Sequence, residues 1–195
     1  SQLPGNTLIN RYMADVIART DGYYYFAYFD FNNFKPFNDR FGFRQGDRVI
    51  LLFSDILKKR FGGDDCFAGH VGGDDFFVGI KSPRESLDEQ TGRFSAVMNE
   101  FNAAVASFYD TRDFNRGYYE SRDREGVERR FPLLTVCDAV VEISHGGRGF
   151  THEEIAPRLA GLKSEAKGRE DGMAVYRLEP NLTHPSKGGA GVRAY

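Results

Sequence analysis

A hairpin signal at residues 66–80 constrains the fold more than any other feature of this sequence. Two apolar runs, CFAGHV at 66–71 and FFVGI at 76–80, flank the tetrapeptide Gly72-Gly73-Asp74-Asp75. Apolar runs on both sides of a glycine-rich tip predict two antiparallel strands joined by a tight turn. Such a hairpin excludes a sheet built only from parallel βαβ units.

Helices and strands are predicted to alternate along the rest of the chain. The aromatic run at 22–29 is short and continuous, which predicts a buried strand. Residues 31–43 are polar and turn-rich. Thr151 and Glu154 have the spacing of a capping box, which predicts a helix beginning near residue 152. Apolar periodicity predicts further helices at 9–19, 45–60 and 94–108 and strands at 132–143 and 172–178. The order predicts an α+β fold, with a central, mostly antiparallel sheet flanked by helices.

Two segments differ in composition from the rest. Residues 110–130 are densely charged and nearly free of aliphatic side chains, so we expect an exposed insertion, with a second hairpin around Tyr118-Tyr119 as one form it could take. Residues 181–195 are rich in Gly and Ser and predict a loose C-terminal tail. We therefore expect one domain at 1–180 that carries the 110–130 insertion.

The bulk composition excludes several classes of protein. The formal net charge is −2, so no overall basic field favours nucleic-acid binding. No apolar run is long enough for a membrane segment. Two cysteines do not make a disulfide framework, which favours free thiols and a cytoplasmic location. The chain begins at Ser1, and we expect it to be part of a longer protein with other domains.

Three carboxylates are expected to lie close together. Asp30 ends the aromatic strand, while Asp74 and Asp75 lie at the hairpin tip. If these strands end together, the carboxylates repel one another unless a cation neutralises them, and oxygen ligands of this kind suit Mg²⁺ together with substrate phosphates. Gly72 and Gly73 allow backbone N–H groups to approach an anion. Taken singly, Asp30 is better explained as a strand-end turn residue and Asp74-Asp75 as an ordinary hairpin turn, and a glycine pair alone is a weak signal.

Residues 30–47 and 70–78 together resemble the two signature blocks of the GGDEF family. The first reads DFNNFKPFNDRFGFRQGD, against a family pattern of D-x-D-x-F-K-x-x-N-D-x-x-G-H-x-x-G-D; the second reads HVGGDDFFV, against GG[DE]EF. LPGN at 3–6 resembles the family's N-terminal LPNR. Two blocks at fixed spacing are far more specific than a single short motif. The matching positions of the first block are Asp30, Phe34, Lys35, Asn38, Asp39, Gly42, Gly46 and Asp47.

The resemblance implies a fold and a reaction. GGDEF domains are similar to the palm of nucleotide cyclases and polymerases, with a ferredoxin-like core. In the family, two subunits each hold one GTP, and each 3′-hydroxyl attacks the α-phosphate of the other GTP. The products are cyclic di-GMP and two pyrophosphates. The resemblance therefore implies GTP, divalent Mg²⁺ or Mn²⁺ and a homodimer as ligands and partner.

Site roles follow from the same resemblance. Asp30, the Phe31 carbonyl, Asp74 and Asp75 are expected at the metal, with Asp74 and Asp75 also catalytic. Asn38 and Asp47 are expected to read the guanine edge, whose N1–H and N2–H₂ are paired donors. The alternatives are a turn or cap role for Asn38 and a helix N-terminal acid for Asp47. The expected phosphate contacts are Phe34 (backbone), Gly72, Gly73, Lys167 and Arg169.

Several positions depart from the family pattern. Asp75 stands where the family has Glu, so its carboxylate is shorter by about 1.5 Å, one C–C bond. This leaves open a backbone shift, a bridging water or weak binding of a second metal. The late AKxxGRN motif is two residues shorter, and Lys163, one turn earlier, is an alternative to Lys167. The family's inhibitory product site is missing, because its Arg and Asp positions hold Gly63 and Cys66.

Three functions remain to be separated. The first is an active diguanylate cyclase. The second is a catalytically degenerate GTP-binding domain that regulates an attached phosphodiesterase or other output domain. The third is an interaction module without nucleotide, which the retained Asn38 and Asp47 argue against.

Overall fold

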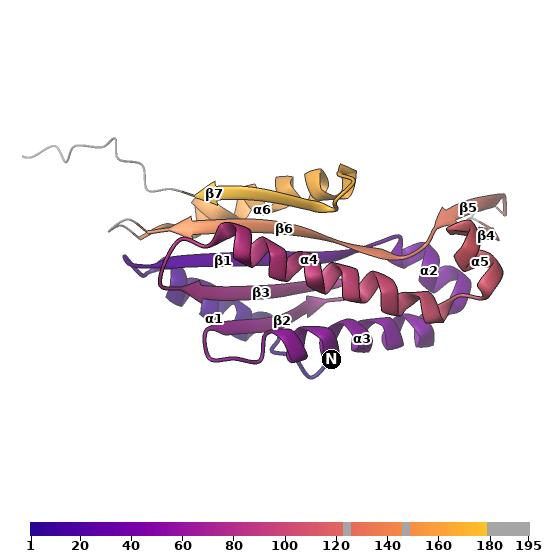
Figure 1. The fold of residues 1–195 in the computed structure, drawn as a ribbon, viewed down its shortest axis with the longest axis horizontal. Coiled ribbons are helices and arrows are strands. Elements are labelled where there is room, and N and C mark those ends of the chain that lie inside the picture. Colours follow the sequence, from indigo (N-terminus) through magenta and orange to yellow (C-terminus); the bar gives the residue numbers. More distant parts are fainter. Residues whose placement is uncertain (123–125, 146–148, 179–195) are drawn as a thin grey trace, which may run out of the picture.

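The structure is a computed structural model that describes residues 1–122, 126–145 and 149–178. Five strands form the main sheet, in the order β2-β3-β1-β6-β7 (Figure 1). All neighbouring strands are antiparallel except β6 and β7. The predicted mostly antiparallel sheet is thus confirmed. The strands are β1 (Tyr23–Asn32), β2 (Cys66–Gly72), β3 (Asp75–Ser82), β6 (Thr135–Ser144) and β7 (Met173–Leu178).

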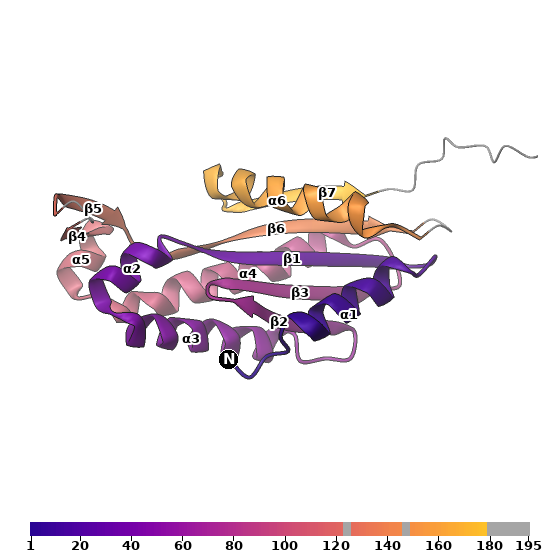
Figure 2. The same cartoon turned by 180° about the vertical axis from the view of Figure 1, so that it is seen from behind.

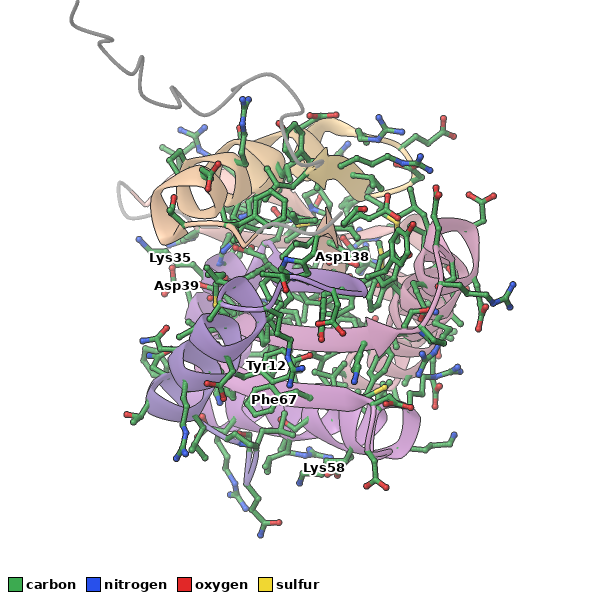
Figure 3. The ribbon with its side chains drawn as sticks, turned by 90° about the vertical axis from the view of Figure 1, so that its left-hand side faces the viewer. Tyr12, Lys35, Asp39, Lys58, Phe67 and Asp138 are labelled. Carbon is green, nitrogen blue, oxygen red and sulfur yellow. The ribbon has the colours of Figure 1, made fainter. Side chains whose placement is uncertain are left out.

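Helices cover both faces of the sheet and divide the core into two clusters. Helices α3 (Phe43–Arg60) and α4 (Leu87–Ala104) pack on one face, where Phe53 and Phe94 meet Phe29 of β1. Helices α1 (Asn6–Ile17) and α6 (His152–Gly168) cover the other face (Figure 2). Tyr12 of α1 stacks on Phe67 of β2 there, with ring centroids 4.7 Å apart (Figure 3). Alternate side chains of β1 supply the two clusters, as a strand period of two requires.

The segment 31–43 contains a helix that its turn-like composition concealed. Helix α2 spans Phe34–Phe41. Pro36 lies in its first turn, where a missing N–H breaks no intrahelical hydrogen bond. Gly42, with φ of +85°, ends the helix and leads into α3. Pro36 and Gly42 therefore mark a helix start and stop rather than a continuous loop.

The insertion contains the hairpin that was one of the expected forms. After a 3₁₀ turn at Val105–Phe108, helix α5 (Thr111–Arg116) leads into β4 (Tyr118–Arg122), which pairs with β5 (Glu128–Pro132). Tyr119 is fully buried and packs against Phe41 of α2, with ring centroids 5.2 Å apart. The insertion is thus anchored beside α2 by aromatic packing.

Other sequence expectations have clear outcomes. The capping box at the start of α6 is present, because the Thr151 N–H donates to Glu154 Oε2 at 2.7 Å. Cys66 and Cys137 are free thiols. Among the helices that the structure describes, none has the length and apolarity that a membrane span requires. The tail at 181–195 lies outside the described residues.

Candidate functional site

The register of the central strands brings the predicted carboxylates together. Asp30 of β1 lies directly opposite Asp75 of β3, at the point where β3 begins. Phe31 and Asn32, which follow Asp30, pair only with β6. The backbone beyond Asp30 is therefore free of a ladder partner on the β3 side, next to the hairpin tip.

The hairpin tip has backbone dihedral angles that favour glycine. Gly72 and Gly73 have φ of +149° and +58°, and the register shifts between His70 and Gly72. The His70 ring stacks on Phe76 with centroids 4.4 Å apart, and its Nε2 lies 2.9 Å from the Gly73 carbonyl oxygen. His70 thus ties the tip to the strand that follows it.

The N-terminal segment braces the same hairpin from outside. The Asn6 side-chain amide donates to the Val71 carbonyl at 2.9 Å, and the His70 N–H donates to the Pro4 carbonyl at 2.8 Å. A side chain at Gly69 would lie 2.5 Å from Ile9 of α1. The LPGN segment and α1 therefore fix β2 and its turn in place.

Two lysines of α6 contact the carboxylates from the face of the sheet that α6 covers. Lys163 Nζ lies 2.9 Å from Asp30 Oδ2 and also donates to Asp75 Oδ1. Lys167 Nζ lies 2.6 Å from Asp30 Oδ1. Lysines four residues apart share one face of a helix, so both side chains meet the end of β1.

These contacts determine the charge state of the cluster. Burial works against ionisation of Asp30, but the two lysines outweigh it and lower the pKa of its carboxyl. Burial would likewise lower the pKa of Lys163 and Lys167, and their carboxylate partners raise it. The cluster therefore holds paired charges at neutral pH.

Asp74 lies beside this cluster in a different electrostatic environment. Burial raises the pKa of Asp74, and the negative charges of Asp30 and Asp75 raise it further. A cation bound next to Asp74 would relieve this repulsion. The three acids converge as the sequence predicts, although Asp30 and Asp75 share a lysine between them.

The predicted guanine-reading residues come from α2 and α3. Asn38 Oδ1 is buried and has no hydrogen-bond partner among the described residues. A Cβ at Gly46 would lie 1.9 Å from that oxygen, so only glycine leaves room for the Asn38 side chain. Asp47, the next residue of α3, is exposed. Phe34 is buried against Phe31, with ring centroids 5.4 Å apart, and fixes the start of α2.

Asn33 precedes α2 in a left-handed conformation, with φ of +65°. It has no side-chain cap contact that would explain this conformation. Asn tolerates left-handed backbone better than most residues, and the turn allows α2 to begin directly after β1. The expected phosphate-binding backbone near Phe34 is therefore a tight strand-to-helix turn next to the carboxylate cluster.

Arg169 is the predicted site residue that does not join the cluster. Its guanidinium pairs with Asp171 at 3.0 Å and lies 3.7 Å from Glu165. Lys163, which the sequence indicated only as an alternative to Lys167, contacts two of the acids. In the sequence, its spacing of four residues from Lys167 was the signal that both lysines lie on one face of the helix.

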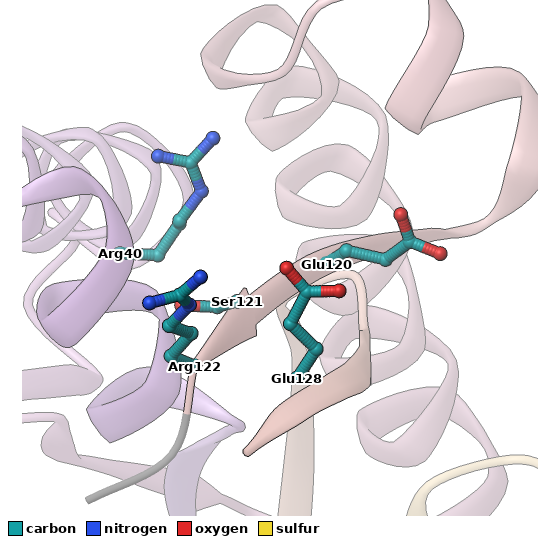
Figure 4. Close-up of a pocket in the computed structure, with 5 residues that line it drawn as sticks. All are labelled: Arg40, Glu120, Ser121, Arg122 and Glu128. Atoms are coloured by element: carbon teal, nitrogen blue, oxygen red, sulfur yellow. The ribbon is translucent and has the colours of Figure 1, made fainter. Parts of the chain in front are cut away.

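A hollow of about 260 Å³ lies between α2 and the insertion (Figure 4). Arg40 of α2 lines it together with four residues of the hairpin. Arg122 and Glu128 are cross-strand partners there. The hairpin residues that line the hollow are Glu120, Ser121, Arg122 and Glu128.

The family model "Diguanylate cyclase, GGDEF domain" matches residues 1–121, more than half of the chain. The chain belongs to the GGDEF family. The match includes both signature blocks, together with the carboxylates of β1 and the hairpin. No curated protein sequence matches the chain.

Solved GGDEF structures share the fold of this GGDEF domain at low sequence identity. The GGDEF domain of DgcB from Caulobacter crescentus, solved with c-di-GMP, is 18% identical with a TM-score of 0.64, over 90% of this chain and 92% of that one. The diguanylate cyclase SiaD from Pseudomonas aeruginosa, solved with its activator SiaC, is 18% identical with a TM-score of 0.62, over 90% and 59%. The active GGEEF domain from Vibrio cholerae is 17% identical with a TM-score of 0.57, over 91% and 100%. These likenesses confirm the predicted palm-like α+β fold.

The cluster contains oxygen atoms that could take part in binding a divalent cation. Asp30, Asp74 and the Phe31 carbonyl supply hard oxygen donors, as Mg²⁺ or Mn²⁺ prefers. Asp75 already accepts a hydrogen bond from Lys163. Among the described residues, no group of three or more His, Cys, Asp or Glu is arranged to hold a metal by itself. Substrate phosphates would therefore have to complete the coordination.

Proposed function

We propose that this GGDEF domain is a diguanylate cyclase that condenses two GTP molecules into cyclic di-GMP. The convergence of Asp30, Asp74 and Asp75 with Lys163 and Lys167, at the tip of a glycine turn, carries the proposal. Carboxylates that face lysines beside a glycine turn are suited to phosphate transfer, in which positioning and charge stabilisation supply most of the catalysis.

Guanine recognition is assigned to α2 and α3. The unpartnered Asn38 Oδ1 is an acceptor for a guanine N–H, and the exposed Asp47 carboxylate accepts from the paired N1–H and N2–H₂ donors. Adenine presents an acceptor in place of guanine N1–H, so Asp47 would repel it. The pocket should therefore prefer GTP to ATP.

The triphosphate lies along the turn between β1 and α2 and the tip at Gly72-Gly73, where backbone N–H groups hold its oxygens. Lys167 leaves Asp30 to reach the phosphates. Asp30, Asp74 and the Phe31 carbonyl would hold Mg²⁺ or Mn²⁺, which would neutralise the charge that develops on the phosphates.

The reaction requires two copies of the chain that face each other. The 3′-hydroxyl oxygen of one GTP attacks the α-phosphorus of the other, while the bond to the β-phosphate oxygen breaks and pyrophosphate leaves. A second equivalent step closes the ring and releases the second pyrophosphate. Asp74 is the carboxylate that we assign to accept the hydroxyl proton.

Titration calorimetry with a non-hydrolysable GTP analogue tests the binding half of this proposal. We expect Mg²⁺-dependent binding, and a loss of about 100-fold in affinity in Asp47→Ala, because two donors of the base lose a charged acceptor. Asp55→Ala is the matched control, because Asp55 is an exposed acid of the same helix and pairs with Lys58. Equal affinity of Asp47→Ala and wild type would contradict the assignment. If the chain binds the analogue but forms no product from GTP itself, the regulatory alternative is favoured.

A further inference from the structure

The Lys163 ammonium lies between two carboxylates that come from adjacent strands. Its Nζ is 2.9 Å from Asp30 Oδ2 and also contacts Asp75 Oδ1. Lys167 contacts Asp30 alone, through the other oxygen. Lys163 is thus the only lysine in the described part of the chain that links β1 to β3 through their carboxylates.

This position is one that a bridging divalent ion would otherwise occupy. An ammonium sits about 2.7–2.9 Å from carboxylate oxygens, and Mg²⁺ sits about 2.0–2.1 Å from them. Both ions need the space between the same two oxygens, so they exclude each other. The ammonium also neutralises the charge that would attract a divalent ion there.

Lys163 is held more firmly than Lys167. Its side chain is 28% exposed, against 46% for Lys167, and it has two carboxylate partners where Lys167 has one. Asp75, one methylene shorter than the Glu of the family motif, is one of the two carboxylates that Lys163 contacts. Lys167 is therefore the side chain that is free to leave for a phosphate, and Lys163 is the one that stays.

We propose that Lys163 is a built-in cation that fills the bridging position between Asp30 and Asp75, so that the site takes one divalent ion in place of two. The remaining ion binds on the side of Asp30 and Asp74. The proposal concerns the same site as the proposed cyclase function, but its central measurement needs no nucleotide.

Electron paramagnetic resonance of free Mn²⁺, titrated against the nucleotide-free chain, tests this inference. We expect Lys163→Met to bind Mn²⁺ about tenfold or more tightly than wild type, because a cation no longer occupies the bridge. Lys163→Arg keeps a positive charge at the bridge and should behave like wild type. Lys58→Met is the matched control, since Lys58 lies on α3 and pairs with Asp55, which is not an acid of the cluster. Equal Mn²⁺ affinity in Lys163→Met and wild type would overturn the proposal.

The number of Mn²⁺ ions bound per chain in the presence of the GTP analogue gives a second test, which can be made on the wild-type chain alone. Wild type should bind one Mn²⁺ per chain, and two would overturn the proposal. If Lys163→Met folds, as circular dichroism would establish, it should bind two. If the analogue does not bind at all, the cyclase proposal fails, while the nucleotide-free comparison still decides the role of Lys163.

Discussion

Asp138 is a carboxyl group buried in the core of the sheet. It lies in β6 between Phe29 of β1 and Met173 of β7, fully buried. Neither carboxyl oxygen has a well-formed hydrogen bond among the described residues. Burial raises the pKa of Asp138 well above its ordinary value, and the nearby Tyr28 backbone offsets only part of this. Burial therefore favours the protonated form of Asp138 in the folded chain.

Replacement of Asp138 by Val should stabilise the fold by about 1–3 kcal/mol, because a buried polar group without partners gives way to an apolar one. The folded chain keeps the proton that the unfolded chain loses above a pKa of about 3.9, so wild-type stability falls as pH rises from about 4 toward the raised pKa. The gain should thus be larger at pH 8 than at pH 5 in urea unfolding. Asp138→Asn is the control, because it removes the titrating carboxyl group but keeps polar atoms at this position. A less stable Asp138→Val at pH 8 would contradict this account.

Individual residues of the site were predictable to different degrees. Fixed motif spacing predicted Asp30 and the hairpin acids, and the strand register brings them together. The bridging contact of Lys163 was not predictable, because it depends on where α6 crosses the sheet. Arg169 shows the same limit, since a local Asp171 pairs with it instead. These contacts depend on tertiary geometry that a sequence pattern does not encode.

Among the elements, the insertion is joined to α2 through one buried aromatic side chain. Tyr119 of β4 packs on Phe41, Tyr109 and Phe131, with ring centroids between 5.2 and 5.9 Å. The exposed edge of the hairpin carries charged residues. The insertion is therefore attached to the helix that carries Asn38.

Tyr119→Ala should destabilise the chain by about 3–5 kcal/mol, because a buried aromatic ring is lost and leaves a cavity. Phe114→Ala is the matched control, since Phe114 is an aromatic of the same insertion that is 48% exposed, and it should change the free energy of unfolding by less than about 0.5 kcal/mol. Urea unfolding measures both. A Tyr119→Ala effect no larger than that of Phe114→Ala would show that the insertion is not anchored in this way.

Elements with strong local signals were predicted and those with mixed signals were not. The hairpin at 66–80 and the capping box of α6 follow from glycine pairs and side-chain capping, which act within a few residues. Helix α2 was concealed because Pro36 and Gly42 are common in turns as well as at helix ends. The start of β6 at Thr135 differs from the predicted 132 because Pro132 ends β5.

At the scale of the whole molecule, the sheet is a platform that brings separate parts of the chain to one site. The end of β1 and the hairpin supply carboxylates, α6 supplies lysines across one face, and α2 and α3 supply the proposed guanine contacts beyond the strand ends. In the proposed function, one subunit holds one GTP and the reaction needs a second copy to present the other.

The most direct test of the central claim is the formation of cyclic di-GMP from GTP and Mg²⁺, followed by chromatography while the chain concentration is raised. The account predicts that the rate per chain increases with concentration, because two copies must meet, with two pyrophosphates released per product. Asp74→Asn should abolish turnover, because it removes a carboxylate of the proposed metal and catalytic site. GTP that is bound at every concentration without formation of cyclic di-GMP would contradict the account.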